Sequence, residues 1–179
     1  MNKYLSLFVG LVLFACASPD EKIQRQTLET ILAEYEECKL NSQSVGACKN
    51  FVSRAICEYN GITDFIKDGE YVDYHEVFEI VVDKWKWKTL GYATNQEVLI
   101  EAQELANKGI AVVAINTNDK HKLPVLITTG ELIKSTKWKL DVPNCAAFFP
   151  FNGPPSFISK SLNYAWSKPD GVKIYARKG

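Results

Sequence analysis

Cys48 is the residue best placed for chemistry, because it lies between a small polar loop (residues 41–46) and an apolar segment that begins at Phe51. A thiol at a helix N-terminus feels the positive end of the helix dipole and several free backbone N–H groups. Both favour the thiolate, which is the nucleophilic form. The segment therefore supports a catalytic cysteine. An equally supported interpretation is a buried or disulfide-bonded residue, since cysteine is among the most buried residue types.

The remaining cysteines bear on this choice. The sequence contains five cysteines, and if Cys16 carries a lipid, Cys38, Cys48, Cys57 and Cys145 remain. In an oxidising compartment these four residues allow three pairings into two disulfides. A bond between Cys38 and Cys48 across the polar loop would remove the thiol. A bond of Cys57 with Cys38 or with Cys145 would leave Cys48 free.

The sequence has two histidines, and they define the options for a metal or a general base. His75 has Asp73 and Glu76 as neighbours, but the spacing does not place the three side chains on one helical face. Two histidines also give little support to a zinc enzyme. We therefore expect no metal and no other cofactor, and we interpret His75 as a surface residue. His121 remains as the candidate general base.

Composition excludes some classes of partner. Lysine plus arginine and aspartate plus glutamate both number 21, so the net charge gives no electrostatic case for nucleic acid. Aromatic residues make up 12% of the chain. That content fits a folded domain with an apolar interior and is not typical of a disordered chain.

The N-terminal segment is typical of an export signal. A short positive start (residues 1–3) precedes an apolar run (residues 4–14) that is too short to span a membrane as a structural helix. Residues 13–16 (LFAC) resemble a bacterial lipobox, which implies that Cys16 becomes the lipid-bearing first residue. Several acyl chains on one residue would anchor the protein stably. The alternative is an ordinary signal peptide cut after Ala15 or Ala17.

The order of the expected elements gives the fold class. Apolar residues at three- and four-residue spacing predict helices, and short β-branched runs predict strands. Thr94 and Glu97 are expected to form a capping box. Helices first and strands second predict an α+β fold, with N-terminal helices packed on a small antiparallel sheet. The expected helices span residues 26–40, 47–60, 75–87 and 94–108, and the expected strands span residues 110–115, 124–129, 138–142 and 172–176, with a turn at 67–70 and a short helix or strand at 161–166.

Several segments together resemble NlpC-like cell-wall cysteine peptidases and amidases, which have a papain-like fold. The resemblance covers most of residues 38–179 and depends on the order of the motifs more than on any one of them. It favours residues 26–179 as one domain, which follows the signal peptide expected at residues 1–15 and a polar tether expected at residues 16–25. The segments are residues 46–52 (GACKNFV), 101–109 with 112–114, the S-x-x-W-x-x-x-V-P arrangement from Ser135 to Pro143, and 162–166 with 172–177.

The resemblance implies acyl transfer on an amide bond of a peptidoglycan stem peptide. Cys48 would be the nucleophile, and backbone N–H groups at the helix start would hold the oxyanion. Such enzymes usually carry a Gly-His at the start of a strand, and the corresponding position here is near Leu123. His121 is the nearest imidazole and would serve as the base. An equally supported interpretation is an exposed loop histidine between Lys120 and Lys122. Asp141 or Asn144, with preference for Asn144, would orient it.

Aromatic side chains, among them Tyr35 and Trp138, are expected to line a substrate cleft, although aromatic residues in such numbers are more often core.

Three functions stay open. The first is a lipid-anchored hydrolase that cleaves peptidoglycan. The second is an inactive relative that binds peptidoglycan or a protein partner, and the third is a structural lipoprotein without a cleft. Ala17 after Cys16 resembles the sorting signal for an outer-membrane anchor facing the periplasm.

Overall fold

The computed structural model describes residues 19–42, 47–83, 85–150 and 154–179. The expected signal peptide at residues 1–15 and the lipidation site Cys16 lie outside these ranges. None of the helices in the described ranges is both long enough and apolar enough to cross a membrane.

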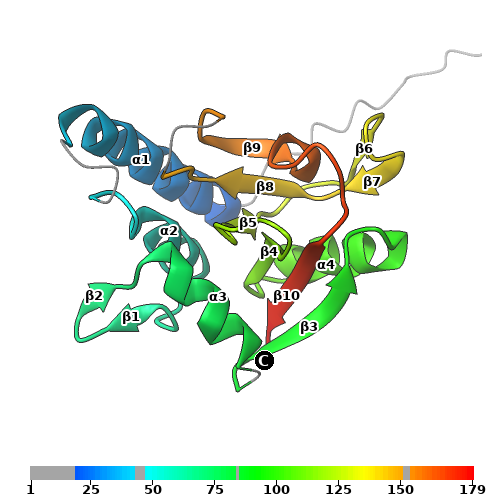
Figure 1. Ribbon diagram of the computed structural model, residues 1–179, viewed down its shortest axis with the longest axis horizontal. Helices are drawn as coiled ribbons and strands as arrows, with labels where there is room; N and C mark the ends of the chain where they lie inside the picture. The colour runs from blue at the N-terminus through cyan, green and yellow to red at the C-terminus, as the bar shows by residue number, and fades with distance from the viewer. Residues whose placement is uncertain (1–18, 43–46, 84, 151–153) are drawn as a thin grey trace, which may run out of the picture.

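The described chain forms four α-helices and one 3-10 helix around antiparallel strands, which confirms the α+β class (Figure 1). Helix α1 packs against α2 and also reaches strand β9, whereas α2 contacts β5. Helix α4 contacts β3, β4, β5, β7 and β10. The helices are α1 (Pro19–Asn41), α2 (Phe51–Asn60), α3 (Tyr74–Val82), α4 (Gln96–Asn107) and η1 (Leu162–Tyr164).

Six strands form the main sheet in the order β3-β10-β4-β5-β8-β9, and each neighbouring pair is antiparallel. Two separate ribbons, β1-β2 and β6-β7, flank it. The bounds are β1 (Ile66–Lys67), β2 (Glu70–Tyr71), β3 (Trp87–Tyr92), β4 (Val112–Asn116), β5 (Pro124–Ile127), β6 (Ile133–Ser135), β7 (Leu140–Val142), β8 (Asn144–Ala147), β9 (Phe157–Ser161) and β10 (Val172–Arg177).

The core lies between the central strands and the helices. Residues 112–115 of β4 and all four residues of β5 are buried, as expected for strands in the middle of a covered sheet. The expected apolar face of α1 is also confirmed, since Leu28, Ile31 and Tyr35 are buried at intervals of three and four residues. This face holds α1 along α2 and fixes the position of the first helix.

A buried carboxylate, Asp64, ties the end of the chain to the segment after α2. It accepts hydrogen bonds from Arg177 Nε at 2.9 Å, from Trp87 Nε1 at 3.1 Å and from Lys86 Nζ at 3.3 Å. Burial alone would raise the pKa of Asp64, but the bonds and charges of Arg177 and Lys86 outweigh it and hold the pKa below its usual value. The carboxylate therefore stays ionised and joins β3, β10 and residue 64.

The starts of α1 and α2 differ from the prediction. Helix α1 begins at Pro19, so residues 19–25 are helical and not an extended tether. Proline at the first helical position and the acidic pair Asp20 and Glu21 in the first turn both favour this start. Helix α2 begins at Phe51, and residues 47–50 form a turn before it.

The expected helix over residues 75–87 ends at Val82, and Trp87 instead begins β3. The cap of α4 is also different, because Asn95 and not Thr94 accepts the backbone N–H of Glu97 at 3.0 Å. Strand β3, and likewise β6 and β9, was not predicted. Strands β3 and β9 are the two outer strands of the main sheet, and each has few buried residues. Neither therefore shows the apolar alternation on which the prediction of a strand depends.

Candidate functional site

Cys48 lies in the turn before α2 and forms a disulfide with Cys38, which lies near the end of α1. The side chain is also buried, with 4% of its surface exposed. A disulfide sulfur has no proton to lose and provides no thiolate. In this form Cys48 cannot supply the nucleophile that the sequence analysis assigned to it, and that role stays a prediction for reduced protein only. Cys57 and Cys145 are free and buried, and burial raises the pKa of both thiols.

His121 lies in the turn between β4 and β5, where its backbone N–H donates to the carboxylate of Asp119 at 2.9 Å. Tyr74 connects this turn to the region of Cys48. The backbone N–H of Tyr74 donates to the carbonyl of Lys49 at 3.2 Å, and burial, with smaller contributions from Asp73 and Asp119, raises the pKa of its phenol. Tyr74 is buried at the start of α3, and its hydrogen bond ties α3 to the turn that holds Cys48.

Leu123 occupies the position at which the resemblance expects the base, and it is buried. It precedes β5 directly and belongs to the core. An apolar side chain at this point cannot accept a proton from a thiol. Cys48 is therefore oxidised, and the position at which the resemblance expects the base holds a leucine, with His121 two residues away.

Asn144 lies at the opposite end of β5 from His121. The backbone N–H of Thr128 donates to the carbonyl of Asn144 at 3.0 Å, whereas His121 precedes the start of β5 at Pro124. Four residues of extended chain between Pro124 and Thr128 span about 13 Å. The strand therefore lies between the two residues, and the expectation that Asn144 orients His121 stays a prediction that this arrangement does not favour.

Tyr35 and Trp138 lie in the core, so the expectation that they line a cleft is wrong. Tyr35 has no exposed surface and donates its hydroxyl to the carbonyl of Phe149, while burial raises its pKa to about 12. Trp138 is 6% exposed, and its Nε1 donates to the carbonyl of Trp166 at 3.1 Å. The backbone N–H of Trp138 donates to Ser135 Oγ at 3.1 Å, so the S-x-x-W spacing forms a turn.

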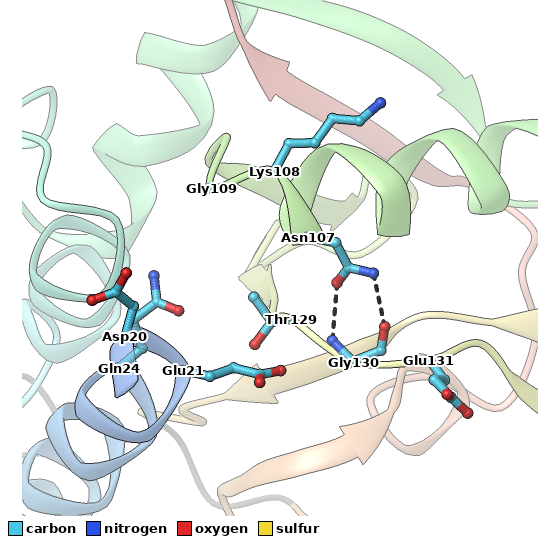
Figure 2. A pocket seen from close by; sticks show the side chains of 9 residues that line it. All are labelled: Asp20, Glu21, Gln24, Asn107, Lys108, Gly109, Thr129, Gly130 and Glu131. Carbon is cyan, nitrogen blue, oxygen red and sulfur yellow. Dashed lines mark hydrogen bonds between the residues drawn. The ribbon is translucent and has the colours of Figure 1, made fainter. Parts of the chain in front are cut away.

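A groove is present elsewhere, between the first turns of α1 and the segment that follows β5. Asp20, Glu21 and Gln24 of α1 line it with residues 129–131 and the end of α4. Figure 2 shows the Glu21 side chain extending from α1 toward Gly130. This part of the groove has a volume of about 540 Å³. Asn107 fixes one wall by two hydrogen bonds of 3.0 Å with the backbone of Gly130, drawn as dashed lines in Figure 2.

A second part of the groove, of about 510 Å³, shares Glu21, Thr129 and Gly130 with the first. Lys22 and Arg25 line it, together with the apolar Leu28 and the ring of Tyr59. The Tyr59 hydroxyl accepts the backbone N–H of Thr129 at 2.9 Å, which holds α2 against this segment. The two parts together form one groove. Acidic residues and Lys108 line the first part, and Lys22, Arg25 and the shared Glu21 line the second.

Gly130 and Asn144 meet at the wall of this groove. Gly130 has a φ of +144°, and a Cβ atom there would come within 2.5 Å of Asn144 Nδ2, so only glycine fits without movement. Asn144 Oδ1 is buried and has no hydrogen-bond partner among the described residues. A buried acceptor without a donor is uncommon in a folded protein. Its position favours a ligand that brings a donor to the groove.

Sequence reasoning missed this groove. Asn107, Gly109 and the Gly130-Glu131 pair could be recognised as a helix end and a turn, but the contact between Asn107 and Gly130 depends on how α4 docks on the sheet. Within the described ranges, no three His, Cys, Asp or Glu residues gather as a metal site.

No protein-family model matches this sequence, and no curated protein is similar enough to count as a match. The likeness to NlpC-like proteins therefore depends on the sequence motifs alone, and any function has to be argued from the geometry of this chain.

Proposed function

We propose that this protein is a lipid-anchored envelope protein with an NlpC-like, papain-like scaffold that binds a peptidoglycan stem peptide without cleaving it. The observation that carries the proposal is the disulfide between Cys38 and Cys48, which occupies the nucleophile position. Leu123 at the position of the base supports it further. A disulfide also fits an oxidising compartment such as the periplasm, where an outer-membrane lipoprotein would be located.

The groove between α1 and residues 128–131 is the proposed binding site. Asp20, Glu21 and Glu131 make one part mainly acidic, although Lys108 also lines it. Lys22 and Arg25 make the other part mainly basic, although Glu21 lines it as well. A stem peptide carries both free amines and free carboxylates, so its charges complement both parts. The unpartnered Asn144 Oδ1 offers an acceptor for a peptide N–H at the groove wall.

The groove is distinct from the position of Cys48, the residue that the resemblance expects as the nucleophile. Tyr59 at the end of α2 lines the groove, whereas Cys48 precedes the start of the same helix. The ten residues of α2 separate the two by about 15 Å. Binding at the groove therefore does not need the thiol, and it does not place a peptide bond next to Cys48.

Co-sedimentation with insoluble peptidoglycan tests the proposal. Glu131→Gln and Arg25→Gln each remove one charge from the groove, and we expect each to weaken binding about fivefold, as for charge-assisted contacts that stay partly solvated. Glu70→Gln and Lys67→Gln on the exposed β1-β2 ribbon are the matched controls and should bind like the parent. Equal binding by groove and ribbon variants, or no sedimentation of the parent, would reject the groove as the site.

A further inference from the structure

A second cavity lies between the β6-β7 ribbon and the end of β9, and its described lining carries only positive charge. It has a volume of about 500 Å³, and Lys134, Lys137 and Lys160 line it together with Tyr164. No aspartate or glutamate is among its described lining residues. We call this cavity the lysine pocket. Three ammonium groups around one cavity repel one another, and an anion between them would relieve that repulsion.

The lysines of this pocket have no acidic partner in the described part of the chain. Two of them instead rest on an aromatic ring. Lys137 Nζ lies 5.9 Å and Lys160 Nζ 5.3 Å from the centre of the Tyr164 ring. Cation–π contacts of this kind hold an ammonium group without neutralising it. Both charges therefore stay available to a ligand.

The floor of the lysine pocket presents hydrogen-bond donors. Ser135, Ser161 and Asn163 are each more than nine-tenths buried and line it. The Ser161 hydroxyl donates to Asn163 Oδ1 at 2.7 Å, which leaves the Nδ2 amide to donate, and no described residue accepts from it. Ser135 Oγ accepts the backbone N–H of Trp138 at 3.1 Å, so its own proton points elsewhere.

We propose that the lysine pocket binds a phosphate group. Three ammonium groups, one amide and one hydroxyl can all donate there, and the nearest acidic group in the ribbon, Asp141 opposite Lys134, is not among the described lining residues. A phosphate offers three or four acceptor oxygens to such a set, whereas a carboxylate offers two, and lysine is a common partner of phosphate. The donor set therefore fits phosphate better than carboxylate. The inference does not depend on the proposed peptide site.

The phosphate could be free, as in a small phosphate ester, or belong to a lipid headgroup, and the chemistry in the pocket is the same. Ser159 lines both the lysine pocket and the groove beside the start of α1. The helix begins at Pro19, three residues after Cys16. A lipid on Cys16 would thus bring a membrane surface to the same side of the molecule.

Calorimetric titration of the full chain carrying Cys16→Ser, which has no acyl anchor, tests the proposal. Inorganic phosphate and glycerol phosphate are compared with chloride at equal ionic strength, and vesicles of phosphatidylglycerol with vesicles of phosphatidylcholine. Lys160→Gln removes one ammonium group from the pocket, and the expected loss is about tenfold in affinity, as for a charge-assisted hydrogen bond. Lys173→Gln is the matched control, because Lys173 Nζ lies 5.1 Å from the Tyr92 ring in the same kind of contact outside the pocket.

Each outcome decides the question. Binding of both soluble phosphates that Lys160→Gln weakens and Lys173→Gln does not would support the pocket, and vesicle binding with the same pattern would add the lipid headgroup as a source. Vesicle binding that both variants weaken equally would show only general attraction to an anionic surface and would overturn the proposal. Absence of phosphate binding would overturn it as well. Asn163→Asp, checked for folding by circular dichroism, should abolish phosphate binding, and unchanged binding would refute the donor argument.

Discussion

The disulfide between Cys38 and Cys48 is expected to be a major stabilising element of this fold. It closes a loop with a sequence separation of 10 between the end of α1 and the start of α2. Loop-closure entropy for a cross-link of that length contributes about 2.7 kcal/mol to the free energy of unfolding at 25 °C. The perturbation is the double variant Cys38→Ala/Cys48→Ala, which removes the cross-link and leaves no thiol behind.

Urea unfolding followed by tryptophan fluorescence measures the effect. Wild-type protein reduced with dithiothreitol is the control, because it loses the cross-link but keeps both side chains. Both samples should lose about 2 to 3 kcal/mol relative to oxidised wild type. A thiol assay in denaturant should find Cys57 and Cys145 free in the oxidised protein. Unfolding curves that coincide for all three samples would refute the reasoning, because the bond would then not restrain the chain.

Three further predictions concern single residues. Asp64→Asn should lower the free energy of unfolding by about 2 kcal/mol at pH 7 because it uncouples Arg177. The pKa of Asp64 is lowered in the folded protein, so this contribution is complete above the unfolded pKa of about 4 and is lost as the pH falls through the folded pKa. Urea curves of variant and parent should therefore converge as the pH is lowered. Gly91→Ala should cost about 2 kcal/mol in a thermal melt, since its φ is +148° and the new Cβ would meet Val98 at 2.7 Å. Asn107→Ala should weaken peptidoglycan binding and cost about 1 kcal/mol, measured by sedimentation and urea unfolding.

The parts of the fold that the sequence predicted are those with strong apolar periodicity. The buried face of α1 and the β-branched runs of β4 and β5 have such patterns, and both were located correctly. Strands β3 and β9 at the edges of the sheet carry few buried residues, so the pattern is weak there. The predicted helix over residues 75–87 is too long, because Trp85 and Trp87 continue the apolar spacing of the helix. Trp87 is buried, but it belongs to strand β3.

The site was harder to predict because it depends on contacts between distant segments. Residue types and local spacing identify Cys48 as special, but they do not decide between thiolate and disulfide, and that choice depends on where α1 ends relative to α2. Asn144 was proposed as a polar residue on or after the next strand, yet it and His121 lie toward opposite ends of β5. The groove requires α1, α4 and residues 128–131 to converge, and no local pattern shows this.

Product release from purified peptidoglycan tests the central claim most directly. Oxidised wild-type protein, reduced wild-type protein and Cys48→Ala are incubated with peptidoglycan, and soluble fragments are separated by chromatography while bound protein is recovered by sedimentation. The account predicts that oxidised wild type sediments with the polymer and releases no fragments above a protein-free control, as does Cys48→Ala. Fragments released by oxidised wild type and absent with Cys48→Ala would contradict it, and fragments released only after reduction would assign catalysis to the reduced form.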